Sequence, residues 1–274
     1  GKSAAPAGVK LHKLSSNETP LGPSPKAIAA FEGLAAKLEL YPDGTSTKLK
    51  QAIAGRYGLD PQRIICGNGS DELLELVTKA YLGAGDEGIY SQYGFLVYRI
   101  AILAMGGKPV IVPEKNYTAD VDGILAAVTP KTKIVFLANP NNPDGVLLSR
   151  EALSDLLVRR GRKGWLVIDE AFADCHPDHS FADQVDDRHR LLIFRSFGKF
   201  FGLAGLRLGF VLGPRPILAS LRKQLGAWPV SAAAIAEGRD FAGLGLAPTS
   251  SEAIVSSYLW RFRKTGQFDT LQAR

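Results

Sequence analysis

Residues 195–210 read RSFGKFFGLAGLRLGF, and this stretch sets the expectations for the fold and the function. Lys199 stands between two apolar, strand-like segments, and Arg207 follows it. An amine between apolar segments can lie in a partly dry site that lowers its pKa, and such an amine can form a Schiff base with an aldehyde. Arg207 would then offer a planar fork for a phosphate. The alternative is a surface lysine and arginine that flank a β-hairpin.

Outward from this stretch, strand-like and helix-like segments alternate along the chain. The strand-like segments are residues 87–91, 108–113, 132–138, 164–170, 190–196 and 206–213. Helices are expected at residues 25–38, 46–58, 71–82, 95–106, 120–128, 149–160 and 215–226. The alternation predicts an α/β fold, a three-layer α/β/α sandwich with a mostly parallel central sheet, whose ligand lies off the carboxyl ends of the strands.

Polar motifs fall at or just after several of these expected strand ends. They are GNGSD at 67–71, SQY at 91–93, NPNNPDG at 139–145, DEAF at 169–172 and SFGK at 196–199. A Gly-rich loop that enters a helix N-terminus, as expected at 67–71, is suited to anion binding because free N–H groups and the helix dipole point the same way. Taken singly, the first motif could be a tight turn and the third a mere turn of Asn, Pro, Asp and Gly.

Composition restricts the function classes. The 274 residues are 46% apolar and 22% charged, and no apolar run is long enough to cross a membrane. The N-terminal residues lack the apolar core of a signal peptide, and two cysteines predict a reducing, cytoplasmic setting. The net charge of +6 suits anionic small molecules, whereas scattered Lys and Arg argue against nucleic acid. Cys175, His176 and His179 lack a fourth ligand at a usual spacing, so no metal is expected.

These motifs, in this order, resemble the pyridoxal-phosphate-dependent aminotransferases of fold type I over roughly residues 10–235. The resemblance implies pyridoxal 5'-phosphate as cofactor. It implies that Lys199 binds the cofactor aldehyde and then moves a proton as a base. It also implies that Asp169, at the end of an apolar strand, keeps the pyridine nitrogen protonated. A semi-buried aspartate there would need a positively charged partner, and a turn-capping aspartate is the alternative.

The same resemblance assigns the remaining site residues. The expected phosphate cradle consists of Gly69, Ser70, Asp71, Ser196 and Arg207. Tyr93 would stack on the cofactor ring, with a buried core tyrosine as the alternative, and Asn142 would bond the ring hydroxyl. Asn17 and Glu18 are implied on the substrate side. Tyr41 is implied to reach the cofactor phosphate of a neighbouring subunit. Active sites are then shared between two copies of the chain, so the resemblance implies a homodimer.

Two branches of the family are matched by different parts of the chain. Residues 10–138 resemble histidinol-phosphate aminotransferases of histidine biosynthesis, which convert L-histidinol phosphate and 2-oxoglutarate to imidazole acetol phosphate and L-glutamate. Residues 139–235 resemble the threonine-phosphate decarboxylases of cobalamin biosynthesis. Three departures from the aminotransferase pattern fit the second branch: Asp144 for threonine, Phe172 for tyrosine and Gly198 for serine.

The aminotransferase is the expected function. The alternatives are a decarboxylase-like enzyme and a truncated, cofactor-binding pseudoenzyme. The expected domains are an N-terminal arm at 1–24, a cofactor-binding large domain at 25–235 and a partial small C-terminal domain at 236–274. In that last segment Arg261 and Arg263 are available to bind a substrate carboxylate.

Overall fold

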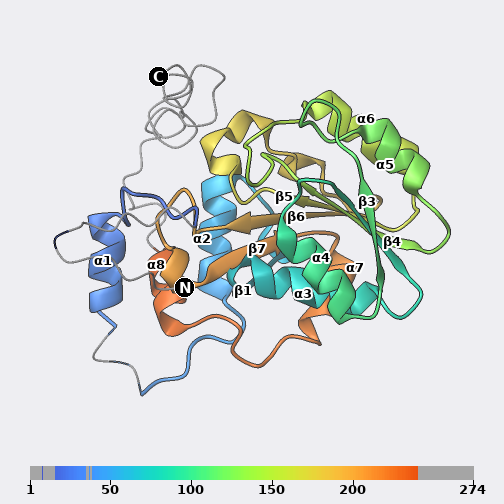
Figure 1. The fold of residues 1–274 in the computed structure, drawn as a ribbon. Coiled ribbons are helices and arrows are strands. Elements are labelled where there is room, and N and C mark those ends of the chain that lie inside the picture. Colours follow the sequence, from blue (N-terminus) through green and yellow to red (C-terminus); the bar gives the residue numbers. More distant parts are fainter. Residues whose placement is uncertain (1–7, 9–15, 35–36, 38, 240–274) are drawn as a thin grey trace.

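One mixed β-sheet lies between two layers of helices in the computed structural model, which describes residues 8, 16–34, 37 and 39–239 (Figure 1). The strands are β1 Ile64–Asn68, β2 Glu87–Ser91, β3 Lys108–Val112, β4 Thr132–Ala138, β5 Trp165–Asp169, β6 Leu191–Ser196 and β7 Leu208–Leu212. The α-helices are α1 Pro25–Glu32, α2 Thr47–Tyr57, α3 Gly69–Tyr81, α4 Leu96–Ala104, α5 Val121–Ala127, α6 Arg150–Arg160, α7 Arg215–Arg222 and α8 Ala232–Arg239. Short 3-10 helices are η2 Pro61–Arg63, η3 Ala173–Cys175, η4 Pro177–His179, η5 Ala182–Gln184 and η6 Ala204–Leu206.

The strand order across the sheet is β1-β7-β6-β5-β4-β2-β3. Neighbouring strands are parallel except at β7, which runs antiparallel to both β1 and β6. The carboxyl ends of β1, β4, β5 and β6 therefore meet at one edge, and β7 begins at that same edge. This confirms the predicted α/β sandwich, and it brings segments distant in sequence to one place.

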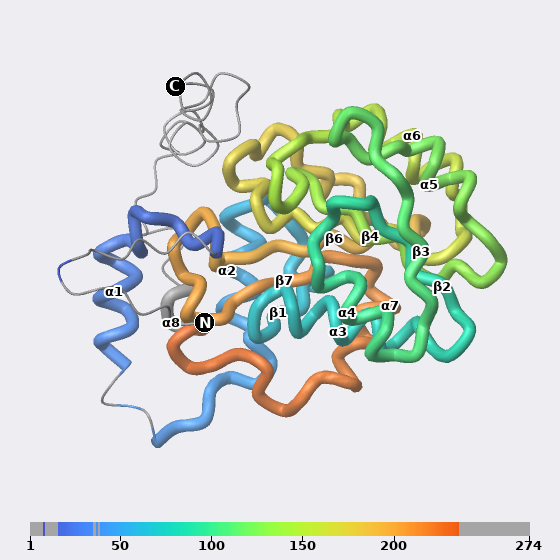
Figure 2. The backbone as a smooth tube through the Cα atoms, in the orientation of Figure 1, coloured from blue at the N-terminus to red at the C-terminus, as the bar shows by residue number. Residues whose placement is uncertain are grey.

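Both faces of the sheet are buried, which explains why its strands read as continuous apolar runs. In β4 and β5, alternate side chains enter opposite cores: Val135 and Ile168 face one, whereas Phe136 and Val167 face the other. Helices α2, α5, α6 and α8 cover the first face, and α3, α4 and α7 cover the second (Figure 2). None of the helices in the described part of the chain is long and apolar enough to span a membrane.

Several expected boundaries differ in the structure. The segment 67–70 is no loop, because β1 runs through Asn68 and α3 begins at Gly69, which has a positive φ of 83°. Glu72 then turns back to accept the Asn68 N–H at 2.6 Å, closing the helix start. The first predicted helix ends at Glu32, where Gly33 is the C-cap. Helix α8 was not predicted, and the expected small domain at 236–274 lies outside the described residues apart from the α8 backbone.

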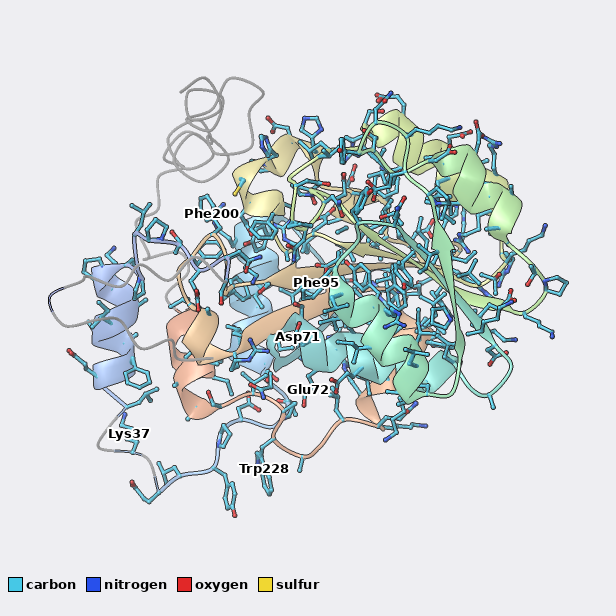
Figure 3. All side chains as sticks on the ribbon, viewed as in Figure 1. Lys37, Asp71, Glu72, Phe95, Phe200 and Trp228 are labelled. Atoms are coloured by element: carbon cyan, nitrogen blue, oxygen red, sulfur yellow. The ribbon has the colours of Figure 1, made fainter. Side chains whose placement is uncertain are left out.

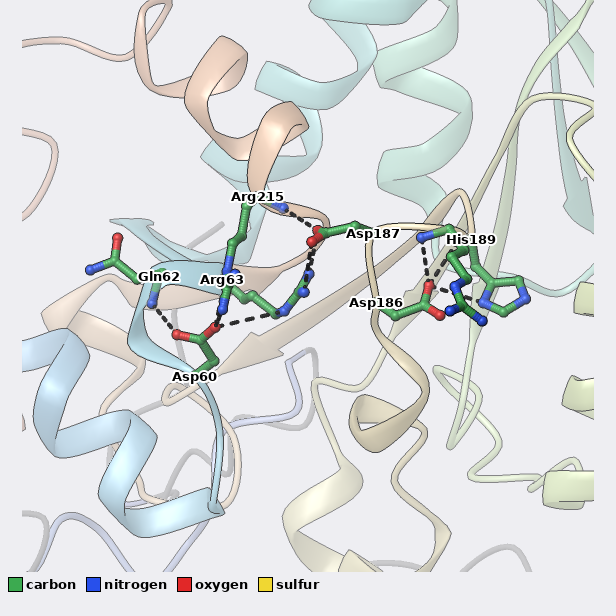
Figure 4. A network of polar contacts seen from close by, with 8 residues as sticks. Asp60, Gln62, Arg63, Asp186, Asp187, His189 and Arg215 are labelled. Atoms are coloured by element: carbon green, nitrogen blue, oxygen red, sulfur yellow. Dashed lines mark hydrogen bonds and ion pairs between the residues drawn. The ribbon is translucent and has the colours of Figure 1, made fainter.

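Charged side chains tie the start of β1 to the segment before β6 and to α7 (Figure 4). Arg63 contacts Asp187 at 2.6 Å, and Arg215 contacts Asp60 at 2.5 Å. These groups are partly exposed, so each pair contributes at most about 1 kcal/mol. They help to define where these surface segments lie without dominating the stability of the fold.

A second set of charges is fully buried and joins β5 to β6. Arg195 donates to Glu170 at 2.8 Å and to Asp174 at 3.0 Å, and all three side chains are at most 8% exposed. The guanidinium carbon of Arg195 also lies 4.7 Å from the ring centre of Tyr57, whose hydroxyl donates to Asp174. Glu170 accepts the Phe181 N–H at 2.6 Å, so the carboxylates have several partners. This network fixes the chain immediately after Asp169 and before Ser196.

We expect Arg195→Met to lower the free energy of unfolding by about 3–5 kcal/mol, because two buried carboxylates lose their counter-charge. Urea unfolding followed by circular dichroism measures this. The matched control is Arg159→Met, which removes an exposed arginine paired with Asp155 and Asp122. That change should cost less than about 1 kcal/mol, and equal losses in the two variants would contradict the role given to Arg195.

Candidate active site

The polar motifs meet at the edge of the sheet where the parallel strands end. The end of β1 enters α3, β4 continues into residues 139–145, β5 ends at Asp169, and β6 ends at Ser196. Arg207 stands directly before β7, on the same edge. The prediction that these segments gather at strand ends is thus confirmed, because parallel strands put their carboxyl ends together.

Lys199 lies in the loop after β6 and is half-buried. Its Nζ donates to Asn17 Oδ1 at 2.5 Å and lies 5.9 Å from the ring centre of Phe172. Burial is the largest cause that lowers the pKa of Lys199, with a further contribution from the charge of Arg207. The predicted partly dry amine is therefore present. A lowered pKa leaves more of the amine uncharged at neutral pH, which a nucleophile or base requires.

Asn17, in the N-terminal segment, contacts this lysine directly. Besides accepting from Lys199, Asn17 donates to Asn142 Oδ1 at 3.4 Å, so its amide links the lysine loop to the loop after β4. The negative charge of Glu18 acts to raise the pKa of Lys199, so this carboxylate is close enough to influence the ionisation of the lysine. Sequence reasoning assigned Asn17 and Glu18 to a substrate and missed the direct contact with Lys199. No local pattern connects residues 182 positions apart.

Asp169 is 4% exposed, more deeply buried than the sequence predicted. Its Oδ1 accepts the Ala171 N–H at 3.1 Å, and its Oδ2 accepts the Tyr98 hydroxyl at 2.9 Å. Among the described residues, both hydrogen-bond donors to Asp169 are neutral, and the positively charged partner expected for this carboxylate stays a prediction. Burial raises the pKa of Asp169 to about 6, whereas the Tyr98 and Ala171 hydrogen bonds and the charge of Lys199 act to lower it.

Arg207 lies against the start of α3, where the phosphate cradle is expected; Figure 3 labels Asp71 and Glu72 in the first turn of this helix. A Cβ built on Gly69 would lie 2.6 Å from Arg207 Nη2, and one built on Gly209 would lie 2.5 Å from the Ser70 nitrogen. At Gly209 only glycine permits the approach of the Ser70 backbone, and at Gly69 the positive φ of 83° favours glycine. The first N–H groups of a helix have no acceptor within the helix, and its dipole favours an anion there.

Arg207 itself has a left-handed backbone, with φ of 56°. For a residue with a side chain this conformation costs about 1–2 kcal/mol, so packing and ion pairing must hold it in place. Its Nη2 pairs with Asp71 Oδ2 at 2.8 Å, and the guanidinium remains about half exposed. Ser196 Oγ accepts the Gly198 N–H at 3.2 Å, which leaves its hydroxyl hydrogen available to donate. These groups together offer several donors to a phosphate.

Other expected site residues have partners elsewhere. Tyr93 is 46% exposed, so the buried-core alternative is wrong, and its ring lies 5.8 Å from that of Tyr117. Tyr41 is 78% exposed and stacks with ring centres 4.3 Å apart on Trp228, which Figure 3 labels. No contact of the described residues joins either tyrosine to Lys199. Asp144 takes a structural part, because its carboxylate accepts from Asn141 and from the Val146 N–H and so closes the loop.

The possible metal ligands do not gather into a site. The rings of His176 and His179 are 6.2 Å apart, and Cys175 is a buried free thiol whose pKa burial raises to about 11. Within the ranges that the structure describes, no group of three or more His, Cys, Asp or Glu side chains could hold a metal ion.

Comparison with known proteins identifies the family. The family model described as "Aminotransferase class I and II" matches residues 9–237. The chain belongs to this family. Histidinol-phosphate aminotransferase from Rhodopseudomonas palustris strain HaA2 is 45% identical over 279 residues, which cover 99% of this chain and 75% of that protein. The enzyme of the same name from strain TIE-1 is 49% identical over 235 residues, 84% of this chain and 64% of the relative.

Solved structures of the family share the fold. A histidinol-phosphate aminotransferase from Sinorhizobium meliloti, in complex with pyridoxal-5'-phosphate, superposes with a TM-score of 0.78 at 30% identity, covering 84% of this chain and 64% of that one. An L-threonine-O-3-phosphate decarboxylase from Porphyromonas gingivalis gives a TM-score of 0.67 at 22% identity, covering 78% and 66%. The second likeness shows a common fold alone. The chain thus spans 64–75% of the length of these proteins.

Proposed function

We propose that this protein is a pyridoxal-phosphate-dependent histidinol-phosphate aminotransferase. The reaction would convert L-histidinol phosphate and 2-oxoglutarate to imidazole acetol phosphate and L-glutamate. The observation that carries the proposal is the placement of a half-buried lysine, a buried aspartate and a glycine-arginine cradle on one sheet edge. The 45–49% identity to enzymes of this name supports the substrate assignment. The decarboxylase alternative is supported by the residues Asp144, Phe172 and Gly198 and by a likeness in fold at 22% identity.

The residues present fit the cofactor. Pyridoxal phosphate has an aldehyde, a pyridine nitrogen, a ring hydroxyl and a phosphate, and the chain offers a matching group for each. Lys199 would take the aldehyde and Asp169 would face the ring nitrogen, while Asn142 would serve the ring hydroxyl. Gly69, Ser70 and Asp71 at the start of α3, with Ser196 and Arg207, would hold the phosphate; in this cradle a Cβ at Gly209 would collide with the Ser70 backbone nitrogen.

When bound, the cofactor supplies an electron sink for the bond broken at the substrate α-carbon. Lys199 Nζ would carry the proton from that carbon, and burial prepares it by lowering its pKa. Asp169, as an ionised carboxylate, would hold the ring nitrogen in its protonated form. Asn17, now bonded to Lys199, would exchange this contact for one with substrate and so release the amine. We also assign Glu18 to the substrate side of the site.

Tyr41, Tyr93 and the domain division extend the proposal. Tyr41 is largely exposed and stacks on the half-exposed ring of Trp228, a pair of apolar surfaces suited to cover by another chain. We infer a homodimer in which Tyr41 reaches the cofactor phosphate of the second copy. Tyr93 would stack on the cofactor ring. We further infer an arm at 1–24, a large domain at 25–235 and part of a small domain at 236–274.

A single-turnover experiment tests the function. The cofactor-loaded protein is mixed with L-histidinol phosphate without 2-oxoglutarate, and imidazole acetol phosphate is quantified by mass spectrometry. We expect about one equivalent per site. L-Histidinol, which lacks the phosphate, is the matched control and should react much more slowly. Carbon dioxide release from O-phospho-L-threonine alone would favour the decarboxylase, and cofactor binding without either reaction would favour a pseudoenzyme.

A further inference from the structure

Tyr98 is a buried tyrosine that contacts Asp169 of the proposed site. It is on α4, and its hydroxyl donates to Asp169 Oδ2 at 2.9 Å, across 71 positions of sequence. The other carboxylate oxygen is bonded to the Ala171 N–H. A carboxylate oxygen has two acceptor sites, so each oxygen of Asp169 can still accept one more hydrogen bond. The two existing bonds define the rotation of the carboxylate and leave one acceptor site on each oxygen for a further donor.

The ring of Tyr98 is itself held rigidly. Tyr98 is 1% exposed, its ring stacks on Phe136 at 4.9 Å with an interplanar angle of 6°, and Phe95 meets it edge-on at 5.8 Å. Offset-stacked and edge-to-face packing of this kind restricts a ring to one orientation. The Tyr98 hydroxyl is therefore already in place to donate to Asp169 before a ligand binds, so it acts as a preorganised donor.

We propose that Tyr98 is a positioning residue for the reaction: its hydroxyl fixes the carboxylate of Asp169 toward the cofactor nitrogen and favours the ionised form. This inference rests on the proposed cofactor role of Asp169. A hydroxyl that donates stabilises an acceptor best when the acceptor is charged, and this bond opposes the effect of burial on the carboxylate.

The surrounding charges support this direction. Lys199 and Asp71 are the charged groups whose fields act on Asp169, and they act in opposite senses, the lysine favouring ionisation and Asp71 opposing it. Burial and the charge of Asp169 raise the pKa of Tyr98 well above its usual value, so the phenol keeps its proton and remains a donor. The hydrogen bonds from two neutral donors, the Tyr98 hydroxyl and the Ala171 N–H, also favour the ionised form of Asp169.

The chain offers a matched pair of variants. Tyr98→Phe removes the hydroxyl and keeps the ring that packs on Phe136. Tyr90→Phe is the control, because Tyr90 is also buried in the same core and its hydroxyl oxygen has no hydrogen-bond partner among the described residues. Both changes delete one oxygen atom from a buried aromatic ring, but only one removes a bond to Asp169.

The primary measurement is the titration of the Asp169 carboxyl carbon by NMR in the cofactor-free protein, with the signal identified by its absence in Asp169→Asn. We expect Tyr98→Phe to raise the titration midpoint by about one pH unit, a tenfold change in proton affinity, and Tyr90→Phe to leave it in place. In the loaded enzyme the acidic limb of kcat should move upward in Tyr98→Phe while KM changes little. A merely structural role would not move this limb.

An unchanged midpoint in Tyr98→Phe would overturn the inference. Should that variant fail to fold, replacement of all tyrosines by 3-fluorotyrosine, a stronger donor of nearly the same size, provides the test. It should lower the Asp169 midpoint, and an unchanged or higher midpoint would overturn the inference. Failure of the proposed function is distinguishable, because wild-type protein loaded with pyridoxal phosphate would then form no imidazole acetol phosphate from L-histidinol phosphate, whichever way the Asp169 signal titrates.

Discussion

Replacing Lys199 with alanine is expected to abolish the near-visible absorbance of bound pyridoxal phosphate attached to the protein and to lower the turnover rate by at least about 10²- to 10⁴-fold. The size follows from removing a proton-transferring base, and losing the covalent attachment adds to it. Absorbance spectra and steady-state rates measure the two effects. The lysine has no other task in the described fold that would explain such a loss, since its one hydrogen bond is to Asn17.

A lysine elsewhere on the surface supplies the control. Lys163→Ala, in the turn after α6, should leave both absorbance and rate close to wild type. Attached cofactor in Lys199→Ala, with the spectrum of wild type, would contradict the role assigned to this residue. A lost spectrum with an unchanged rate would contradict it equally.

Asp169→Asn is the second change with a large expected effect. We expect the variant to retain cofactor but to lose about 10²- to 10³-fold in kcat, the size seen when a preorganised electrostatic partner is removed. The amide is nearly isosteric and can still accept from Tyr98 or Ala171, but it carries no charge for the ring nitrogen. A near-wild-type kcat in the loaded variant would count against Asp169 as that partner.

In the absence of cofactor and at high pH, Asp169→Asn should be more stable than the wild-type protein. Burial makes Asp169 hold its proton more tightly in the folded chain, with a pKa of about 6, than in the unfolded chain. Its ionisation therefore costs stability as the pH rises through about 6. Each unit of difference between the pKa in the folded and in the unfolded chain is worth about 1.4 kcal/mol. Asp169→Asn should therefore stabilise the cofactor-free protein by up to about 3 kcal/mol at pH 8 and little at pH 4.

Thermal or urea unfolding of the cofactor-free protein at both pH values measures this difference. Equal stabilisation at pH 4 and pH 8 would contradict the sign derived above. Opposite changes in stability and in kcat are expected for a charge that is held in place for a reaction at some cost to the fold.

The strands were predictable because each contains apolar residues in a short segment bounded by polar or turn-forming residues. Residues 87–91 and 132–138 were delimited in agreement with β2 and β4, since both faces of these strands are buried and their ends are marked by polar turns. The fold class followed from the alternation with helices. The boundary at Gly69 was not predictable, because a direct passage from strand to helix depends on a positive φ that glycine permits but does not require.

The candidate site was only partly predictable for a related reason. Lys199, Asp169 and Arg207 stand in motifs next to apolar strands, so local sequence singles them out. Tyr98 lies on the buried face of a helix, where it resembles any core aromatic residue, and Arg195 resembles an ordinary strand residue. Their partners are 71 and 21–25 positions distant, and such pairings arise from the folded sheet alone.

The most direct test of the central claim is to locate the cofactor on the chain. The wild-type protein loaded with pyridoxal phosphate is reduced with borohydride, digested with trypsin and mapped by mass spectrometry. Trypsin cleaves after Arg195 and Arg207, and a modified Lys199 resists cleavage, so the account predicts one labelled peptide comprising residues 196–207. Label on a different lysine, or no label above that of a Lys199→Ala control, would contradict it.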